Sequence, residues 1–136
     1  MIEYRSGNDL DVVQTAELYE RSTLATRRPT GVRGNVEKML RNANLVITAW
    51  SDGRMVGIAR SFSDFVYITY LSDLAVDQAY QHQGIGKELI RLTQVASGPK
   101  TTVLLIAAPA SVDYYPHIGF SRHNSAWLLS PGATVT

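Results

Sequence analysis

Two glycines, Gly84 and Gly86, stand one residue apart between an apolar segment and an amphipathic helix. The helix is indicated by apolar residues at helical spacing, namely Ile85, Leu89, Leu92 and Ala96. The segment before the turn and residues 102–107 after the helix are rich in strand-forming side chains. A strand, a helix and a strand of this length form a right-handed crossover with parallel strands. The turn therefore predicts a sheet that contains a parallel pair.

The residues upstream predict an antiparallel meander in the same sheet. Residues 45–50 and 55–63 are rich in β-formers, and Asp52 and Gly53 between them are a strong hairpin signal. Residues 65–76 form a third, long strand that is dense in aromatic and β-branched side chains. Because the three strands are close in sequence, we expect them to pair as antiparallel neighbours.

The remaining segments complete an α+β fold: a mixed, mostly antiparallel sheet with helices on both faces, in a single domain over residues 1–136. A short strand over residues 2–5 precedes a helix that Asn8 or Asp9 caps and that runs to about Ser22. A second helix is expected over residues 35–42, and the helix that follows the glycine turn should end at Ser97, Gly98 and Pro99. After it we expect a buried strand over residues 102–107, a short helix over residues 112–118, and a last strand region that opens at Phe120 and includes residues 127–129.

Composition narrows the function classes. The chain has 136 residues, 45% of them hydrophobic, which suffices for one domain with a sizeable core. The 13 Lys and Arg against 12 Asp and Glu give a net charge of +1, unlike the basic stripe of a nucleic-acid binder. The absence of cysteine excludes disulfides, thiolate metal sites and a cysteine nucleophile. No apolar run approaches the ~20 residues of a membrane span, so we expect a soluble cytoplasmic protein without a membrane or nucleic-acid partner.

The glycine turn is a candidate phosphate site. The N-terminus of a helix leaves backbone N–H groups unpaired and carries positive potential, and glycine lets an anion approach the backbone closely. A Walker A loop is excluded because Gln81 and Glu88 stand where it needs glycine and Ser or Thr. A dinucleotide fingerprint is excluded because Leu89 replaces its third glycine. The turn alone fits an ordinary helix cap equally well.

The surrounding residues resemble a known family. The segment from Leu74 to Ile90, LAVDQAYQHQGIGKELI, resembles motif A of the GNAT superfamily of N-acyltransferases, with Gln81, Gly84 and Gly86 at the characteristic spacing. Downstream, YPHIGF at residues 115–120 resembles the Tyr-x-x-x-Gly-Phe segment of that family. The order of the expected elements also matches the GNAT fold along nearly the whole chain, which implies a splayed central pair of parallel strands.

The resemblance implies acetyl-CoA as cosubstrate and no metal. The pyrophosphate would lie on the backbone amides of the motif A turn, and pantetheine would pair with the backbone of the preceding strand. A backbone N–H near Leu74 or Ala75 would polarise the acyl carbonyl. The implied cofactor-binding residues are Leu74, Ala75, Val76, Gln81, His82, Gln83, Gly84, Ile85, Gly86 and Lys87.

The resemblance also implies catalytic residues. Tyr115 matches the tyrosine that protonates the departing thiolate, so it is the expected general acid, with Tyr114 as a substitute in another register. The alternative for Tyr115 is an aromatic packed under the last strand. Asp73 is a candidate general base, or else a structural carboxylate that holds a strand bulge or a loop. Tyr70 or Ser72 could instead hold a water for this step.

The implied function is N-acetyl transfer from acetyl-CoA to a primary amine of a small molecule or protein, by direct attack in a ternary complex. An alternative is a non-catalytic acyl-CoA-binding sensor or regulatory module. One departure from the family is the stretch 107–110, AAPA, which lacks the asparagine that contacts the cofactor in many relatives. Lys87 and Arg91 could meet the 3′-phosphate end of CoA, or Arg91 could lie on a solvated helix face. The resemblance leaves a homodimer open.

Overall fold

A computed structural model describes residues 1–136 in two compact units, Met1–Ile106 and Ala107–Thr136. The expectation of a single domain stays a prediction. The first unit is built on one five-stranded sheet in the order β1-β2-β3-β4-β5. Its strands are β1 (Glu3–Ser6), β2 (Leu45–Ser51), β3 (Arg54–Ser63), β4 (Ile68–Val76) and β5 (Thr102–Leu105). The first four strands pair antiparallel, and β4 pairs parallel with β5, as the sequence predicts.

Three α-helices accompany the sheet: α1 (Val12–Arg21), α2 (Asn35–Asn42) and α3 (Ile85–Ser97). The predicted caps Asn8 and Asp9 are wrong, because α1 begins later and Asp11 accepts a hydrogen bond from the backbone N–H of Gln14. Asn8 instead donates to the carbonyl of Ala43 after α2. The short 3-10 helices η1 (Leu24–Arg27) and η2 (Gln78–Tyr80) follow α1 and β4, respectively.

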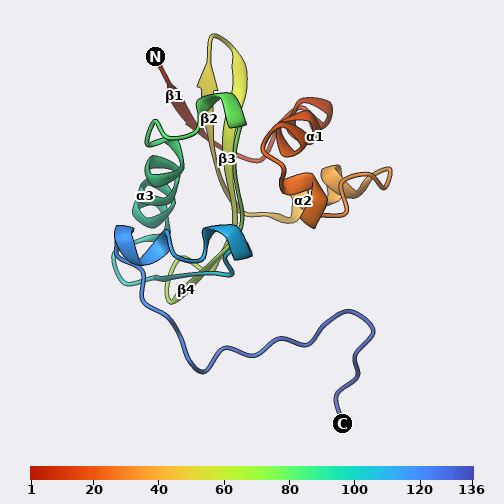
Figure 1. Ribbon diagram of the computed structural model, residues 1–136, viewed down its shortest axis with the longest axis vertical. Helices are drawn as coiled ribbons and strands as arrows, with labels where there is room; N and C mark the ends of the chain where they lie inside the picture. The colour runs from red at the N-terminus through yellow and green to blue at the C-terminus, as the bar shows by residue number, and fades with distance from the viewer. The chain divides into compact units, whose positions relative to one another are not determined.

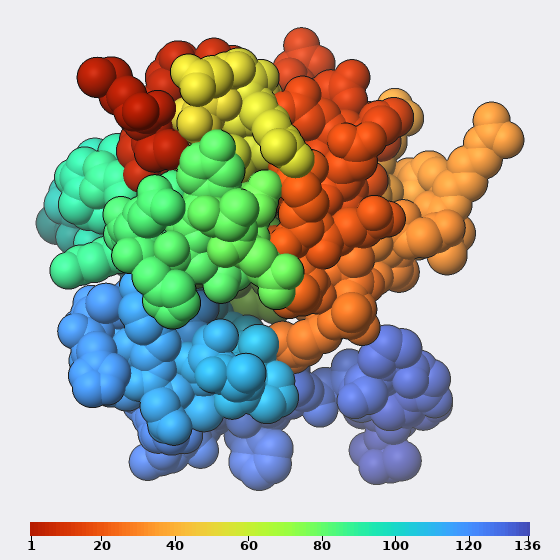
Figure 2. All heavy atoms as spheres, turned by 45° about the horizontal axis from the view of Figure 1, so that its top comes forward, coloured from red at the N-terminus to blue at the C-terminus, as the bar shows by residue number.

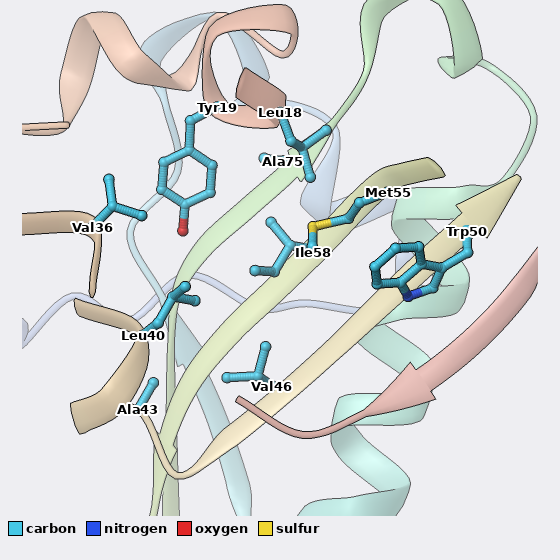
Figure 3. Packing of buried hydrophobic residues seen from close by; sticks show 10 residues of the cluster. All are labelled: Leu18, Tyr19, Val36, Leu40, Ala43, Val46, Trp50, Met55, Ile58 and Ala75. Atoms are coloured by element: carbon cyan, nitrogen blue, oxygen red, sulfur yellow. The ribbon is translucent and has the colours of Figure 1, made fainter. Parts of the chain in front are cut away.

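The helices lie on both faces of the sheet, with α1 and α2 on one side and α3 on the other (Figure 1). Residues 55–61 of β3 are all buried, as expected of a strand covered on both faces. The core under α1 and α2 is shown in Figure 3 and consists of Leu18, Tyr19, Val36, Leu40, Ala43, Val46, Trp50, Met55, Ile58 and Ala75.

The hairpin between β2 and β3 is the one predicted. Asp52 and Gly53 both have positive φ, 49° and 78°, which suits a tight two-residue turn between twisted strands. The third strand is shorter than predicted, because residues 65–67 belong to a loop. The Asp64 carboxylate accepts hydrogen bonds from the backbone N–H groups of Val66, Tyr67 and Ile68, which folds residues 65–67 into a loop before the strand.

β4 contains a bulge at Ser72. Arg60 of β3 pairs with Asp73, but its neighbour Ser61 pairs with Leu71, so Ser72 has no partner in β3. The parallel ladder with β5 covers only residues 68–71 of β4, and the strands share no pairs beyond it. The predicted splay of the parallel pair is therefore present. The predicted buried strand over residues 102–107 is wrong in extent and burial: β5 ends at Leu105 and alternates exposed with half-buried residues.

The second unit contains two short 3-10 helices, η3 (Pro109–Ser111) and η4 (Tyr115–Ile118). The predicted short helix over residues 112–118 is present only in part: residues 112–114 form a turn, and η4 ends at Ile118, as predicted, where Gly119 has φ 101°. The predicted last strand is also wrong, since residues after Phe120 form no strand. Trp127, within the predicted strand region 127–129, is 92% exposed.

Candidate functional site

The turn before α3 presents a row of backbone donors. Gly84 caps the helix in a left-handed conformation with φ 82°, and His82 has φ 64°. The first helical hydrogen bond runs from the N–H of Glu88 to the carbonyl of Gly84, 3.1 Å away. The preceding N–H groups of the helix therefore have no acceptor within it. The turn is exposed, and Figure 2 shows it in green at the surface. Such an end of a three-turn helix attracts anions.

Asp77 fixes the passage from β4 into this turn. Its carboxylate accepts hydrogen bonds from the backbone N–H of Ala79 and from Nε of Arg21, 2.9 and 2.7 Å away. Arg21 also donates to the carbonyl of Met55. Burial raises the pKa of Asp77, but these bonds and the charge of Arg21 outweigh it and lower the pKa below its ordinary value. Sequence reasoning missed this anchor, although an aspartate two residues before a small residue in a polar turn is a cap signal.

Beyond the bulge, alternate residues of β4 direct their backbone N–H and carbonyl groups to opposite edges of the strand. Asp77 donates to Val56 of β3, so alternate residues Ala75 and Asp73 also turn their backbone groups toward β3. Leu74 and Val76 therefore point theirs toward the opposite edge, beyond the ladder with β5. Of the two predicted donors to an acyl carbonyl, the register favours Leu74 over Ala75. The side chain of Ala75 belongs to the core under α1 and α2.

The predicted turn residues meet the end of β4 directly. The side chain of Gln81 donates to the carbonyl of Val76 at 3.1 Å. A Cβ on Gly86 would lie 3.7 Å from Val76 Cγ2 and 3.9 Å from Leu74 Cδ2, so glycine keeps this space open. The side chain of Ile85 is buried against the sheet, so only its backbone is available to a ligand.

The charged and polar side chains of the turn divide into two groups. His82, Gln83 and Lys87 are exposed and make no side-chain hydrogen bond within the protein. Arg91, in contrast, forms an ion pair with Glu88 at 2.6 Å on the helix surface. The pair favours the solvated-face interpretation of Arg91 over a contact with CoA.

Asp73 is enclosed by cationic partners. Its carboxylate, fully buried, accepts hydrogen bonds from Nε of Arg60 at 2.5 Å, Nε of Arg28 at 2.6 Å and the hydroxyl of Tyr19 at 2.7 Å. Burial raises the pKa of Asp73, but the bonds and charge of Arg60, with Tyr19 and Arg28, outweigh it and lower the pKa below the ordinary value. A carboxylate held in this form is a poor general base. The geometry favours the structural role considered for Asp73.

The partners of Asp73 were missed from the sequence. One signal was available: Arg60 is a charge inside the apolar strand VGIARSF, and a buried charge requires a partner. Tyr19 gave no such signal, because an aromatic residue on an amphipathic helix is ordinary core. Burial and the charge of Asp73 raise the pKa of Tyr19, which keeps its hydroxyl a donor. Ser72, a candidate for holding water, donates to Asp73 and accepts from Arg60.

Tyr115 lies at the start of η4 in the second unit. Its ring makes edge contacts with Tyr114 and Phe120, both at a centroid distance of 5.4 Å. Its carbonyl accepts from the N–H of Phe120. Burial raises the pKa of Tyr115, with a smaller contribution from Tyr114, so the phenol stays protonated at neutral pH. Tyr114 is 42% exposed.

No group of three or more His, Asp or Glu side chains gathers in a way that could hold a metal ion. None of the helices combines the length and the apolar character needed to cross a membrane.

Comparisons with known proteins agree on one family. Residues 28–128 match the family model described as Acetyltransferase (GNAT) domain. The chain is 30% identical over 90% of its length to an uncharacterized N-acetyltransferase (ycf52-like) of Prochlorococcus marinus, covering 65% of that protein. It is 28% identical over 88% of its length to histone acetyltransferase TAP1 of Glycine max, covering 55% of it. The chain thus spans only about half to two thirds of the length of such relatives.

A solved structure shows the same fold. The aminoglycoside N-acetyltransferase AAC(6′)-Iy, in complex with CoA, superposes with a TM-score of 0.71 at 17% identity. The superposition covers 94% of this chain and 93% of the other. At this level of identity the likeness concerns the fold.

Proposed function

The chain belongs to the GNAT acetyltransferase family, and from this premise we propose that it transfers an acetyl group from acetyl-CoA to a primary amine. Acyl transfer from an acyl-CoA is the chemistry that the family supports. One observation of this chain carries the finer proposal. The unpaired backbone donors before α3 continue directly from the outward-facing edge of β4, so an anion site and an open strand edge form one surface.

The residues present fit a nucleotide thioester of this kind. The donors of residues 84–87 suit a pyrophosphate, because they combine free N–H groups with the positive end of a helix. The N–H and carbonyl groups of Leu74 and the N–H of Val76 suit the amides of an extended ligand, as an added strand would use them. We assign the N–H of Leu74 to the acyl carbonyl, where a fixed donor stabilises the charge that develops on oxygen.

The proton balance of the reaction assigns a role to Tyr115. The thioester supplies an activated acyl group, the amine loses one proton and the departing sulfur gains one. A tyrosine is protonated at neutral pH, and burial raises the pKa of Tyr115 further, so it has a proton to give. Its role as general acid remains a proposal based on the family motif. We do not assign Asp73 to the removal of the amine proton, since two arginines occupy it.

The acceptor is proposed only as a class, a primary amine of a small molecule or a protein. The named relatives include a histone acetyltransferase and an aminoglycoside acetyltransferase, which take acceptors of both kinds. Direct attack in a ternary complex is part of the same proposal. It requires no residue of the chain to become acylated.

Thermal unfolding with acetyl-CoA tests the proposal. Ligand at about 100 times its dissociation constant adds ~2.7 kcal/mol to the stability of a two-state protein, which raises Tm by several degrees. We expect this rise with acetyl-CoA and CoA but not with ATP or NAD at the same salt concentration. Binding without turnover of any amine in a broad panel would support the alternative, a non-catalytic acyl-CoA sensor. Absence of any rise would overturn both.

A further inference from the structure

The loop between α1 and α2 packs Leu24 and Ala25 against the core, and one of its side chains hydrogen-bonds to the sheet. Within residues 23–34, hydrogen bonds otherwise connect the loop to itself or to the neighbouring helices. Only Arg28 hydrogen-bonds to the sheet: its Nε donates to Asp73 at 2.6 Å and its NH2 group donates to the carbonyl of Ser72 at 2.8 Å. Its remaining terminal nitrogen folds back to the carbonyl of Arg27. The guanidinium thus forms a bridge between loop and strand.

The strand end of this bridge is the bulge. A bulged residue leaves its backbone groups without ladder partners, so something else must satisfy them. Arg28 satisfies the carbonyl of Ser72, and Arg60 donates to its hydroxyl at 3.1 Å. Two residues further on is Leu74, whose N–H points to the open edge because of this same offset in register.

The bridge is a largely buried ion pair. Asp73 is fully buried, and the side chain of Arg28 is 21% exposed. Removing one partner from such a buried group weakens the compensation of its charge, which costs more than loss of an exposed ion pair. Arg60 remains bound to Asp73 from the other side, so loss of Arg28 should loosen the bulge while the core keeps one ion pair.

We propose that Arg28 is a positioning residue, which docks the loop of residues 23–34 onto the bulge and thereby aims the N–H of Leu74 at the acyl carbonyl. The inference rests on the proposed function, because it concerns the geometry of that acyl site. It also couples two parts of the reaction. Whatever orders this loop, such as an acceptor that contacts it, also steadies the donor of β4.

The test measures the C=O stretching frequency of the acetyl group of bound acetyl-CoA. Infrared difference spectra of carbonyl-labelled acetyl-CoA bound to the protein report the hydrogen bond from Leu74, since such a bond lowers the C=O stretching frequency. We expect a lowered frequency with the wild-type chain. Arg28→Gln should lose most of that shift while binding acetyl-CoA with nearly unchanged affinity, because the anion site before α3 is intact. Arg27→Gln is the matched control: its side chain makes no hydrogen bond in the structure, and the shift should remain.

The outcomes separate this inference from the proposed function. A full shift in Arg28→Gln overturns the positioning role and leaves the acyl-CoA site standing. A wild-type chain that binds no acetyl-CoA overturns the proposed function and this inference with it. If Arg28→Gln does not fold, hydrogen exchange of the wild-type chain decides. Acetyl-CoA should then slow exchange in residues 23–34 together with residues 72–76, and protection confined to β4 and the glycine turn would overturn the coupling.

Discussion

Alanine at Gly84 and alanine at Gly86 should separate folding stability from cofactor binding. Gly84 has φ 82°, and nothing lies within 4 Å of a Cβ there, so the cost of alanine is conformational. A left-handed residue with a side chain costs ~1–2 kcal/mol, offset in part by a stiffer unfolded chain. We expect Gly84→Ala to lower the free energy of unfolding by about 1 kcal/mol.

Gly86→Ala should behave in the opposite way. Gly86 does not require positive φ, and its Cβ would meet Val76 and Leu74 at ordinary van der Waals distances, 3.7 and 3.9 Å. Alanine also favours a helix over glycine by up to ~1 kcal/mol, so stability should be unchanged or higher. The added methyl group nevertheless occupies space that the ligand needs beside β4. Crowding of ~1–3 kcal/mol predicts affinity for CoA that is about tenfold weaker or worse.

Urea unfolding followed by circular dichroism measures the first effect, and calorimetric titration with CoA measures the second. The two variants control for each other, because they place the same methyl group two residues apart. Wild-type stability in Gly84→Ala would refute the left-handed turn. Wild-type affinity in Gly86→Ala would refute the turn as the site of CoA.

Three further substitutions test other parts of the structure. Tyr115→Phe should reduce turnover at least tenfold while CoA still binds, since only the phenolic hydroxyl group is lost; unchanged turnover in steady-state assays would remove the general-acid role. Asp73→Asn should destabilise the protein at neutral pH and make its stability less dependent on acid pH. The pKa of Asp73 in the folded protein is below the ordinary 3.8. The stability that the carboxylate contributes is therefore present above pH 3.8 and lost as the pH falls through the folded pKa. Equal acid sensitivity of wild-type and Asp73→Asn would contradict that assignment. Gly57→Ala should cost ~1–3 kcal/mol in denaturant unfolding, because its Cβ would lie 3.0 Å from Leu89 Cδ1 under α3; a cost near zero would mean that the helix shifts freely.

The sequence predicted the regular part of the first unit well because local chemistry determines it. Asp52 and Gly53 specify the hairpin by their tolerance of positive φ, and the spacing from Ile85 to Ala96 specifies α3. The parallel pairing followed from the length of the crossover. Where local signals compete, the prediction failed. Three residues near the start of α1 could cap it, and only the fold selects Asp11.

The parts of the candidate site that use backbone groups could be predicted from the sequence. The parts that depend on side-chain contacts between distant segments could not. The glycine turn and the strand before it are found in the sequence, and the resemblance of residues 74–90 to motif A implies their role as a cofactor site. The role of Asp73 is not, because its partners Tyr19, Arg28 and Arg60 come from three separate segments. The second unit was predicted least well: an apolar pattern such as Trp127 to Leu129 favours a strand only if another strand is there to pair with it.

The bulge at Ser72 changes which helices the buried side chains of β4 contact. Burial alternates without interruption along the strand, with the odd-numbered residues from Thr69 to Ala75 on the buried side. Yet Thr69 bonds to Ser97 of α3, whereas Asp73 bonds to Tyr19 of α1. One extra residue thus transfers the buried side from one helical layer to the other. If Ser72 were instead paired in a regular ladder, Leu74 would lie opposite Ile58, and the side chains of Leu74 and Val76 would turn away from α3 and the glycine turn.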